Sequence, residues 1–215
     1  MPFRTEFDHT LLFESVLAGA VFVTVGGLLA FALLRYRAAG RASASQETEH
    51  PRLEAGFAAA LLVIALGIVF ATRGAMAADN RVPSNIGVTV RVTGYQWCWR
   101  FDYSGTPVTV TASCLTGHYP TLVVPSSEPV RIETTSQDVI HSFWIPAFRF
   151  KMDAFPRHVS SFVITAPHPG VWLGHCAEFC GEDHAFMAFH FKAVPAAAFR
   201  SWLTAREAGA FGASG

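Results

Sequence analysis

The chain has 215 residues, which is enough for one globular domain plus a smaller segment. Hydrophobic residues make up 51% of it and charged residues only 15%. Soluble proteins are typically about 25% charged, so this composition indicates membrane segments. The formal net charge is zero, which excludes the global positive field typical of nucleic-acid-binding proteins, and no nucleic-acid partner is expected.

Two long apolar runs lie in the first third of the chain. Residues 11–34 contain a single charge and residues 55–72 contain none. A membrane-spanning helix needs about 20 apolar residues, so we predict transmembrane helices at about 11–34 and 55–74. A cleaved signal peptide is an alternative for the first run, and a buried helix of a soluble domain for the second. The polar start of the chain and the flanking charges Glu54 and Arg73 favour two retained spans.

Basic residues are concentrated between the two runs. They are Arg35, Arg37, Arg41 and Arg52, whereas the N-terminal arm holds only Arg4. Because cytoplasmic loops carry an excess of Lys and Arg, we expect this loop to be cytoplasmic and both termini to lie outside. The predicted organisation is a hairpin in the plasma membrane over residues 1–78 and an extracytoplasmic domain over residues 79–215.

The exterior part of the sequence has the two-residue period of β-strands. Apolar and polar residues alternate over 88–93 and again over 130–135, a pattern typical of half-buried strands. Prolines follow one another at short intervals between residues 107 and 169, which indicates many short strands in a Greek-key sandwich or barrel. Residues 196–207 are predicted to form a terminal helix with one apolar face.

A cluster of soft metal ligands is the most informative feature of the sequence. Cys176, Cys180, His184 and Met187 lie within twelve residues, and thiolate with imidazole is a copper ligand set. A mononuclear blue site has one thiolate, whereas two bridging thiolates would give a dinuclear site that still needs a second imidazole. His141, in an apolar strand-like run, supplies one. Tetrahedral zinc is the alternative metal, but the methionine, the exterior location and the β-rich context favour copper.

At these residues the chain resembles a known family. Residues 138–146 (DVIHSFWIP) and 176–187 (CAEFCGEDHAFM) resemble segments of subunit II of haem–copper cytochrome c oxidases, and the similarity extends through residues 94–103 (GYQWCWRFDY) and both spans. It implies a membrane-anchored all-β protein: a transmembrane hairpin, a cupredoxin-like Greek-key β-barrel and a short C-terminal helix. It also implies the dinuclear copper centre CuA. The ligands carried over are His141, Cys176, Cys180, His184, Met187 and the backbone carbonyl of Glu178.

The resemblance implies a function and several partners. The centre would accept electrons from a c-type cytochrome and pass them to haem in subunit I, where oxygen is reduced to water and protons are pumped. The partners would be subunit I, other oxidase subunits and the cytochrome. A quinol oxidase subunit would lack both cysteines, a nitrous oxide reductase would carry a propeller domain, and a copper carrier would hold copper in an exposed site.

The resemblance implies roles for four further residues, each beside a simpler interpretation. Trp97 would receive electrons at the surface, or pack in the core on the same face of a strand as Trp99. Glu54 would stand at the cytoplasmic mouth of a proton path, or be an ordinary helix-start acid. The Glu178 carboxylate would bind magnesium at the contact with subunit I, or be a solvated loop carboxylate; Asp153 would face the same contact or be an ordinary strand-end acid.

Two features of the exterior domain complete the sequence-based expectations. Cys98 and Cys114 are expected on strands, where they form either a disulfide or two buried free thiols. Five acids are expected to present negative charge to the cytochrome around Trp97: Asp102, Glu128, Asp138, Glu182 and Asp183.

Cys98 departs from the aromatic residue that is usual in the family at this position, and Arg157 with His158 stands where a Gly-Arg pair is usual.

Overall fold

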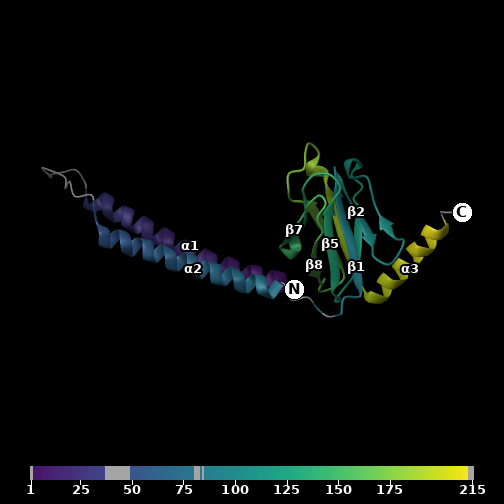
Figure 1. Ribbon diagram of the computed structural model, residues 1–215, viewed down its shortest axis with the longest axis horizontal. Helices are drawn as coiled ribbons and strands as arrows, with labels where there is room; N and C mark the ends of the chain where they lie inside the picture. The colour runs from purple at the N-terminus through teal and green to yellow at the C-terminus, as the bar shows by residue number, and fades with distance from the viewer. Residues whose placement is uncertain (1, 37–48, 80–82, 84, 213–215) are drawn as a thin grey trace. The chain divides into compact units, whose positions relative to one another are not determined.

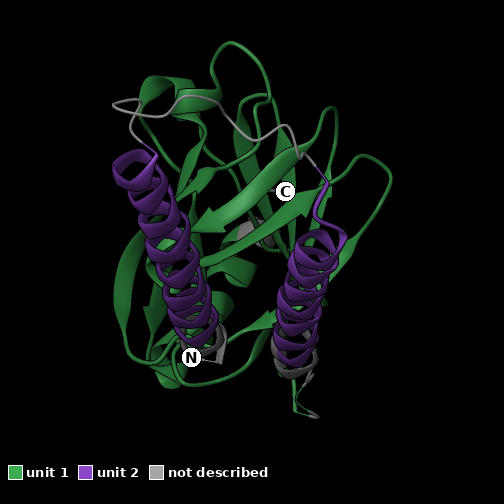
Figure 2. Cartoon of the chain, turned by 90° about the vertical axis from the view of Figure 1, so that its left-hand side faces the viewer, with its two compact units in different colours: residues 1–4, 80–215 green, residues 5–79 purple. Residues whose placement is uncertain are grey.

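The chain divides into two units, each with its own internal contacts (Figures 1 and 2). One is Thr5–Asp79, and the other is Asn80–Gly215 together with Met1–Arg4. The computed structural model describes residues 2–36, 49–79, 83 and 85–212. Residues 37–48 of the expected cytoplasmic loop, which include Arg37 and Arg41, lie outside the described residues.

The first unit consists of two long apolar helices. Helix α1 is Pro2–Arg35 and helix α2 is Pro51–Asp79. Within them, Phe7–Arg35 and Pro51–Gly74 are long and apolar enough to cross a membrane. Their side chains are exposed on nearly every face, and a helix that is hydrophobic all round requires an apolar environment such as lipid. The predicted spans fall inside both helices.

The second unit is built from two five-stranded sheets (Figure 1). In spatial order the first sheet contains β3 (Thr109–Val110), β2 (Cys98–Tyr103), β1 (Val88–Tyr95), β5 (Val130–Ser136) and β8 (Ser160–Ile164). The second contains β4 (Thr121–Pro125), β10 (Ala188–Val194), β9 (Gly170–Cys176), β6 (His141–Ile145) and β7 (Phe150–Ala154). The pairs β1 with β5 and β4 with β10 are parallel, and the others are antiparallel. This arrangement confirms the predicted sandwich-like Greek-key domain.

The core between the sheets is dominated by aromatic rings. Trp99 and Phe101 of the first sheet meet Phe189 of the second with ring centroids 5.7 and 5.8 Å apart, in edge-to-face geometry. Phe143 stacks on Phe189 at 4.5 Å. The predicted alternation is confirmed on β1 and β5, where residues such as Val90 and Ile132 are fully buried. Edge-to-face pairs add to the stabilisation that burial alone provides, so this core is a rigid base for the end of the domain.

The predicted C-terminal helix is confirmed as α3, Ala196–Gly212. Its apolar face packs on Tyr103, whose ring centroid lies 5.2 Å from that of Trp202 and 6.3 Å from that of Phe199. The Tyr103 hydroxyl donates to the Val123 carbonyl (2.7 Å) and accepts from the Val123 amide (2.9 Å). Through this hydroxyl, β2 of one sheet is hydrogen-bonded to β4 of the other.

Cys98 and Cys114 form a disulfide, which decides between the two alternatives left by the sequence. The expectation that both lie on strands is wrong for Cys114, which lies in the short 3-10 helix η1, Cys114–Thr116. Two further 3-10 turns are η2, Pro146–Phe148, and η3, His184–Phe186.

Replacing Tyr103 with Phe removes the hydroxyl but retains the ring. The Val123 amide and carbonyl then lose their partner in a buried environment, so the free energy of unfolding should fall by about 1–3 kcal/mol. Chemical denaturation followed by near-ultraviolet circular dichroism measures this loss. Unchanged stability would show that water replaces the hydroxyl without cost.

Candidate metal centre

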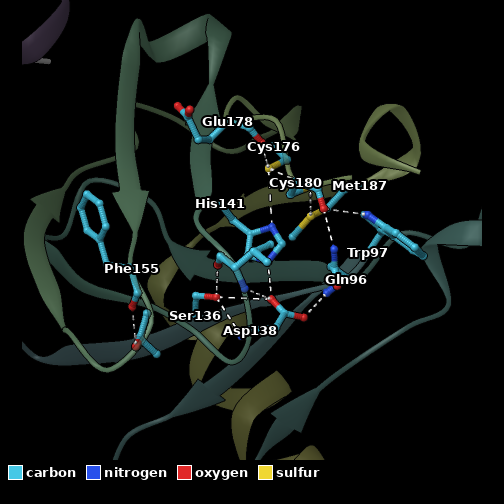
Figure 3. A network of polar contacts seen from close by, with 12 residues as sticks. Gln96, Trp97, Ser136, Asp138, His141, Phe155, Cys176, Glu178, Cys180 and Met187 are labelled. Atoms are coloured by element: carbon cyan, nitrogen blue, oxygen red, sulfur yellow. Dashed lines mark hydrogen bonds and ion pairs between the residues drawn. The ribbon is translucent and has the colours of Figure 1, made fainter. Parts of the chain in front are cut away.

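The expected ligands converge at one end of the second sheet, and Figure 3 shows His141, Cys176, Glu178, Cys180 and Met187 there. His141 is the first residue of β6 and Cys176 the last of β9, and Phe143 of β6 pairs with Cys176 in the antiparallel ladder. The loop after β9 carries Cys180 and His184, and Met187 immediately precedes β10. The loop is anchored at both ends, because the Cys176 amide donates to the Met187 carbonyl at 2.9 Å and the Ala177 amide to the Ser142 carbonyl at 3.0 Å.

Five side-chain donors lie in contact with one another. The Cys176 and Cys180 sulfurs are 3.9 Å apart, and His141 Nδ1 lies 3.9 Å from Cys176 Sγ. On the other side of the pair, His184 Nδ1 lies 3.4 Å from Cys180 Sγ, and Met187 Sδ lies 3.8 Å from the same sulfur. Each thiol is therefore flanked by a different imidazole.

The donor set fits a soft metal site larger than one tetrahedral ion. The ligand atoms of His141, Cys176 and Cys180 lie within 4.8 Å of one another, and all three residues are buried. The Glu178 carbonyl, 3.3 Å from Cys176 Sγ, adds an oxygen donor. Structural zinc takes four ligands, whereas this site offers five side chains and a carbonyl, and one of the side chains is a thioether, the soft, weak ligand that copper accepts.

A carboxylate orients the fully buried His141. Its Nε2 lies 2.8 Å from Asp138 Oδ1, which leaves Nδ1 facing the thiols. Burial by itself lowers the pKa of His141, but its hydrogen bonds to Cys176 and Asp138 outweigh burial, and the pKa is raised. Burial likewise acts to raise the pKa of Asp138, but hydrogen bonds from Gln96, His141 and Val139 lower it overall. The carboxylate is therefore charged at neutral pH.

The two thiols are electrostatically unequal in the protein alone. Burial and the neighbouring Cys176 raise the pKa of Cys180 to about 12. Burial also acts to raise the pKa of Cys176, but hydrogen bonds with His141 and with the Glu178 and Ser142 backbone lower it. Because metal ligation requires thiolates, metal binding must release a proton from Cys180 at neutral pH.

The turn between β1 and β2 is hydrogen-bonded to the metal loop, which is the segment between Cys176 and Met187. Gln96 Nε2 and Trp97 Nε1 donate to the Cys180 carbonyl at 2.7 and 3.1 Å (Figure 3). The backbone amide of Gln96 donates to Asp138 Oδ2 at 2.7 Å. The same turn thus contacts both the metal loop and Asp138, the carboxylate that orients His141.

The expectation that Trp97 and Trp99 share one face of a strand is wrong. Tyr95 pairs with Cys98, so Gln96 and Trp97 form a two-residue turn in which the alternation of the strands is interrupted. Trp97 is half-buried beside the metal loop, whereas Trp99 is fully buried in the core. A hairpin turn cannot be recognised here from composition, because Gln and Trp are not typical turn residues.

A glycine allows the first strand to pass close to His141. A Cβ atom at Gly94 would lie 2.8 Å from His141 Cδ2 and 3.0 Å from Cγ. Gly181 in the metal loop has φ +121, and a Cβ there would lie 3.1 Å from both Gln96 Nε2 and Trp97 Nε1. These two positions require glycine for close approach.

Glu178 and Asp153 lie near one lysine. Lys151 Nζ is 3.7 Å from Glu178 Oε2 and 3.3 Å from Asp153 Oδ1. Asp153 also accepts a hydrogen bond from the hydroxyl of Ser142 at 2.7 Å. Both acids therefore lie on the side of the centre formed by β6, β7 and the loop after β9.

The remaining expected residues are dispersed. Glu54 lies at the start of α2 and accepts a hydrogen bond from the His50 amide at 3.2 Å, which is the contact of a helix-start acid. Among the five expected surface acids, Asp102 is paired with Arg100 at 3.1 Å, and Asp138 binds His141. This role of Asp138 was not among the expected ones, although metal-binding histidines commonly donate their other nitrogen to a carboxylate.

The comparisons with known proteins agree on one family. A family model described as cytochrome c oxidase subunit II, periplasmic domain, matches residues 88–194. Cytochrome c oxidase subunit 2 of Cereibacter sphaeroides is 28% identical over 98% of this chain and 79% of its own length. The crystal structure of the periplasmic domain of subunit II of Bradyrhizobium japonicum cytochrome oxidase is 31% identical, with a TM-score of 0.54, and the match covers 60% of this chain and 99% of that one.

A second solved structure shows the same relationship. It is a mixed disulfide between a thioredoxin-like protein and subunit II of cytochrome c oxidase, and it is 30% identical with a TM-score of 0.51. The match covers 61% of this chain and 97% of that one.

Gly94→Ala should displace His141, because the new methyl group would overlap its ring. We expect metal affinity to fall by about 10- to 100-fold, as for other changes that misorient a ligand. Metal content of the purified protein measures this effect. Gly87→Ala is the matched control, because a Cβ atom there meets nothing within 4 Å. Equal metal content in the two variants would contradict the close-approach argument.

Asp138→Asn should lower the pKa of His141 by removing the neighbouring negative charge. A group whose pKa is higher in the folded than in the unfolded state stabilises the fold at pH values below its unfolded-state pKa. This contribution is lost as pH rises through the folded-state pKa. Without metal, the free energy of unfolding of the variant should therefore be about 1.5 kcal/mol lower than that of the metal-free wild type at about pH 5.5. This is the value of a hydrogen bond to a charged group. Urea unfolding should show the difference narrowing toward about pH 8.5. A difference independent of pH would show that Asp138 does not govern the protonation of His141.

Proposed function

Because the chain belongs to the cytochrome c oxidase subunit II family, we propose that it is the subunit through which electrons enter the oxidase. His141, Cys176, Cys180, His184, Met187 and the Glu178 carbonyl would hold a dinuclear copper centre. Such a centre, when bound, takes up and releases single electrons. The donor would be a c-type cytochrome and the acceptor haem in subunit I, where oxygen is reduced to water with proton pumping.

The observation that carries the proposal is the pairing of each thiol with its own imidazole. His141 lies beside Cys176, and His184 beside Cys180, with the two sulfurs between them. This arrangement suits a pair of coppers, which the two thiolates and the two imidazoles would hold. The burial of His141, both cysteines and Met187 disfavours a copper carrier, which needs an exposed site for exchange.

The surrounding residues limit movement of the ligands. Asp138 fixes the ring of His141, and Gln96 and Trp97 hold the Cys180 carbonyl. Edge contacts from Trp99, whose ring centroid is 6.0 Å from that of His141, fill the space beneath the site. Ligands that are held in place change little when the charge of the centre changes, which favours fast electron transfer.

Trp97 is our candidate for the residue at which electrons enter. Its indole is partly exposed, and its N–H binds the carbonyl of the ligand Cys180, so one side chain connects surface and centre. Glu182 and Asp183 in the same loop would present negative charge to a basic cytochrome. Charges at the rim of such an interface act mainly on the association rate.

Further parts of the proposal concern the membrane and other subunits. We place the copper domain and both termini outside the plasma membrane and the connecting loop in the cytoplasm. Magnesium at the contact with subunit I would use the Glu178 carboxylate and would compete with Lys151 for it. Glu54 at the mouth of a proton path would use the carboxylate that binds the His50 amide in this structure.

Cys180→Ser should abolish the dinuclear centre, because one of the two shared thiolates is lost. Met187→Leu should be milder, since a thioether is the weakest ligand of the set, and should alter the spectrum more than the copper content. Copper analysis and visible absorption of the purified oxidase separate the two effects. If Cys180→Ser retains two coppers and the mixed-valence spectrum, the proposed centre is wrong.

Trp97→Phe should leave copper content and the visible spectrum largely unchanged, because Gln96 retains its hydrogen bond to the Cys180 carbonyl, but it should slow reduction by the cytochrome several-fold. Stopped-flow reduction measures this step, and Trp202→Phe on α3 is a control that retains Trp97. If Trp97→Phe instead lowers copper content while the surviving centres are reduced at the normal rate, Trp97 is a packing residue and electrons enter elsewhere.

A further inference from the structure

We infer that the Cys98–Cys114 disulfide positions the metal centre by fixing the β1–β2 turn beneath it. Its relevance to electron uptake rests on the proposed function, whereas the contacts that define it involve no metal. All the contacts involved lie within the second unit, between residues 80 and 215.

The first half of the bridge holds the turn. Cys98 is the first residue of β2 and follows Gln96 and Trp97 directly. Both turn residues donate side-chain hydrogen bonds to the Cys180 carbonyl, and the Gln96 amide also binds Asp138. A displacement of Cys98 would therefore disturb the hydrogen bonds to the metal loop and to Asp138, which orients His141.

The residue after Cys98 contacts the opposite side of the centre. Trp99 is fully buried, and its ring meets the His141 ring edge-on with centroids 6.0 Å apart. The two tryptophans that flank Cys98 thus contact two different ligands, Trp97 at the Cys180 backbone and Trp99 at the His141 ring. The position of Cys98 sets the position of both.

The second half of the bridge lies against the other end of the metal loop. Cys114 is buried, and its sulfur lies 3.4 Å from the Ala188 carbonyl oxygen. A disulfide sulfur carries no proton, so this is a packing contact. Ala188 follows the ligand Met187, whose carbonyl accepts the Cys176 amide at 2.9 Å. The disulfide therefore spans the base of the centre from the turn to the start of β10.

Burial contributes little at Gln96 and in η1. The Gln96 side chain is exposed, and Cys114 is the buried residue of η1. A covalent link restricts the conformations available to both segments. We therefore expect that loss of the bridge loosens the turn, and with it the hydrogen bonds to the Cys180 carbonyl.

The test is hydrogen exchange at the Trp97 indole N–H in the full-length, metal-free chain in detergent under argon. The five tryptophans give five indole signals, and Trp97→Phe identifies the relevant one. In Cys98→Ala/Cys114→Ala we expect this proton to exchange at least about tenfold faster than in the wild type, because local opening becomes more frequent. In the copper-loaded variant we expect the visible bands to shift or broaden.

A matched control separates positioning from general stability. Ile164→Ala on β8 retains the bridge and removes a buried side chain from the core. It should lower the unfolding temperature without changing Trp97 exchange. If the unbridged variant also shows wild-type exchange, the disulfide only stabilises the domain and the inference is wrong.

A second unbridged variant guards against misfolding. Cys98→Val/Cys114→Ala restores part of the lost volume and should show the same faster exchange. If no copper binds to the wild-type chain, the proposed function fails but the exchange result still decides this inference. If copper binds normally and Trp97 exchange does not change, the inference alone fails.

Discussion

The structure depends on one constraint: polar metal ligands are buried at one end of the domain, and each of them needs a partner. A buried imidazole, two buried thiols and a buried carbonyl each need a partner, because an unsatisfied polar group in such a place costs free energy. Asp138 meets the need of His141, and the Gln96–Trp97 turn meets that of the Cys180 carbonyl. The same contacts that satisfy these groups also fix their positions. The same hydrogen bonds therefore stabilise this end of the domain and set the geometry of the metal site.

The glycines and aromatic residues around the site serve the same constraint. Gly94 lets β1 approach the His141 ring more closely than any side chain would permit. Trp99, Phe143 and Phe189 fill the volume below with edge-to-face and stacked rings. Rings held on several sides have little freedom to move. The metal loop thus lies on a closely packed base whose contacts involve no metal.

Much of this could be predicted from the sequence, for identifiable reasons. The two apolar helices, the alternation on β1 and β5, and the segment from Cys176 to Met187 depend on local patterns, which a sequence displays directly. The ligand set also depends on residue type, since sulfur and imidazole select metals by their chemistry. The roles of Asp138, Gln96 and Lys151 depend instead on contacts between distant segments. The position of Trp97 was missed because a Gln-Trp turn has no turn signature, and the choice between bridge and free thiols for Cys98 and Cys114 required their separation in space.

The two cysteine pairs of the β-sheet unit have opposite requirements. Cys98 and Cys114 are bridged, whereas Cys176 and Cys180 are free thiols with sulfurs 3.9 Å apart. An oxidising environment that closes the first pair can also close the second, and four cysteines allow three different pairings. A closed Cys176–Cys180 pair has no thiolate to offer a metal. Assembly of the proposed copper centre therefore follows an order: copper would have to reach the second pair before an oxidant does, or a reductant would have to reopen that pair while leaving the buried Cys98–Cys114 bridge intact.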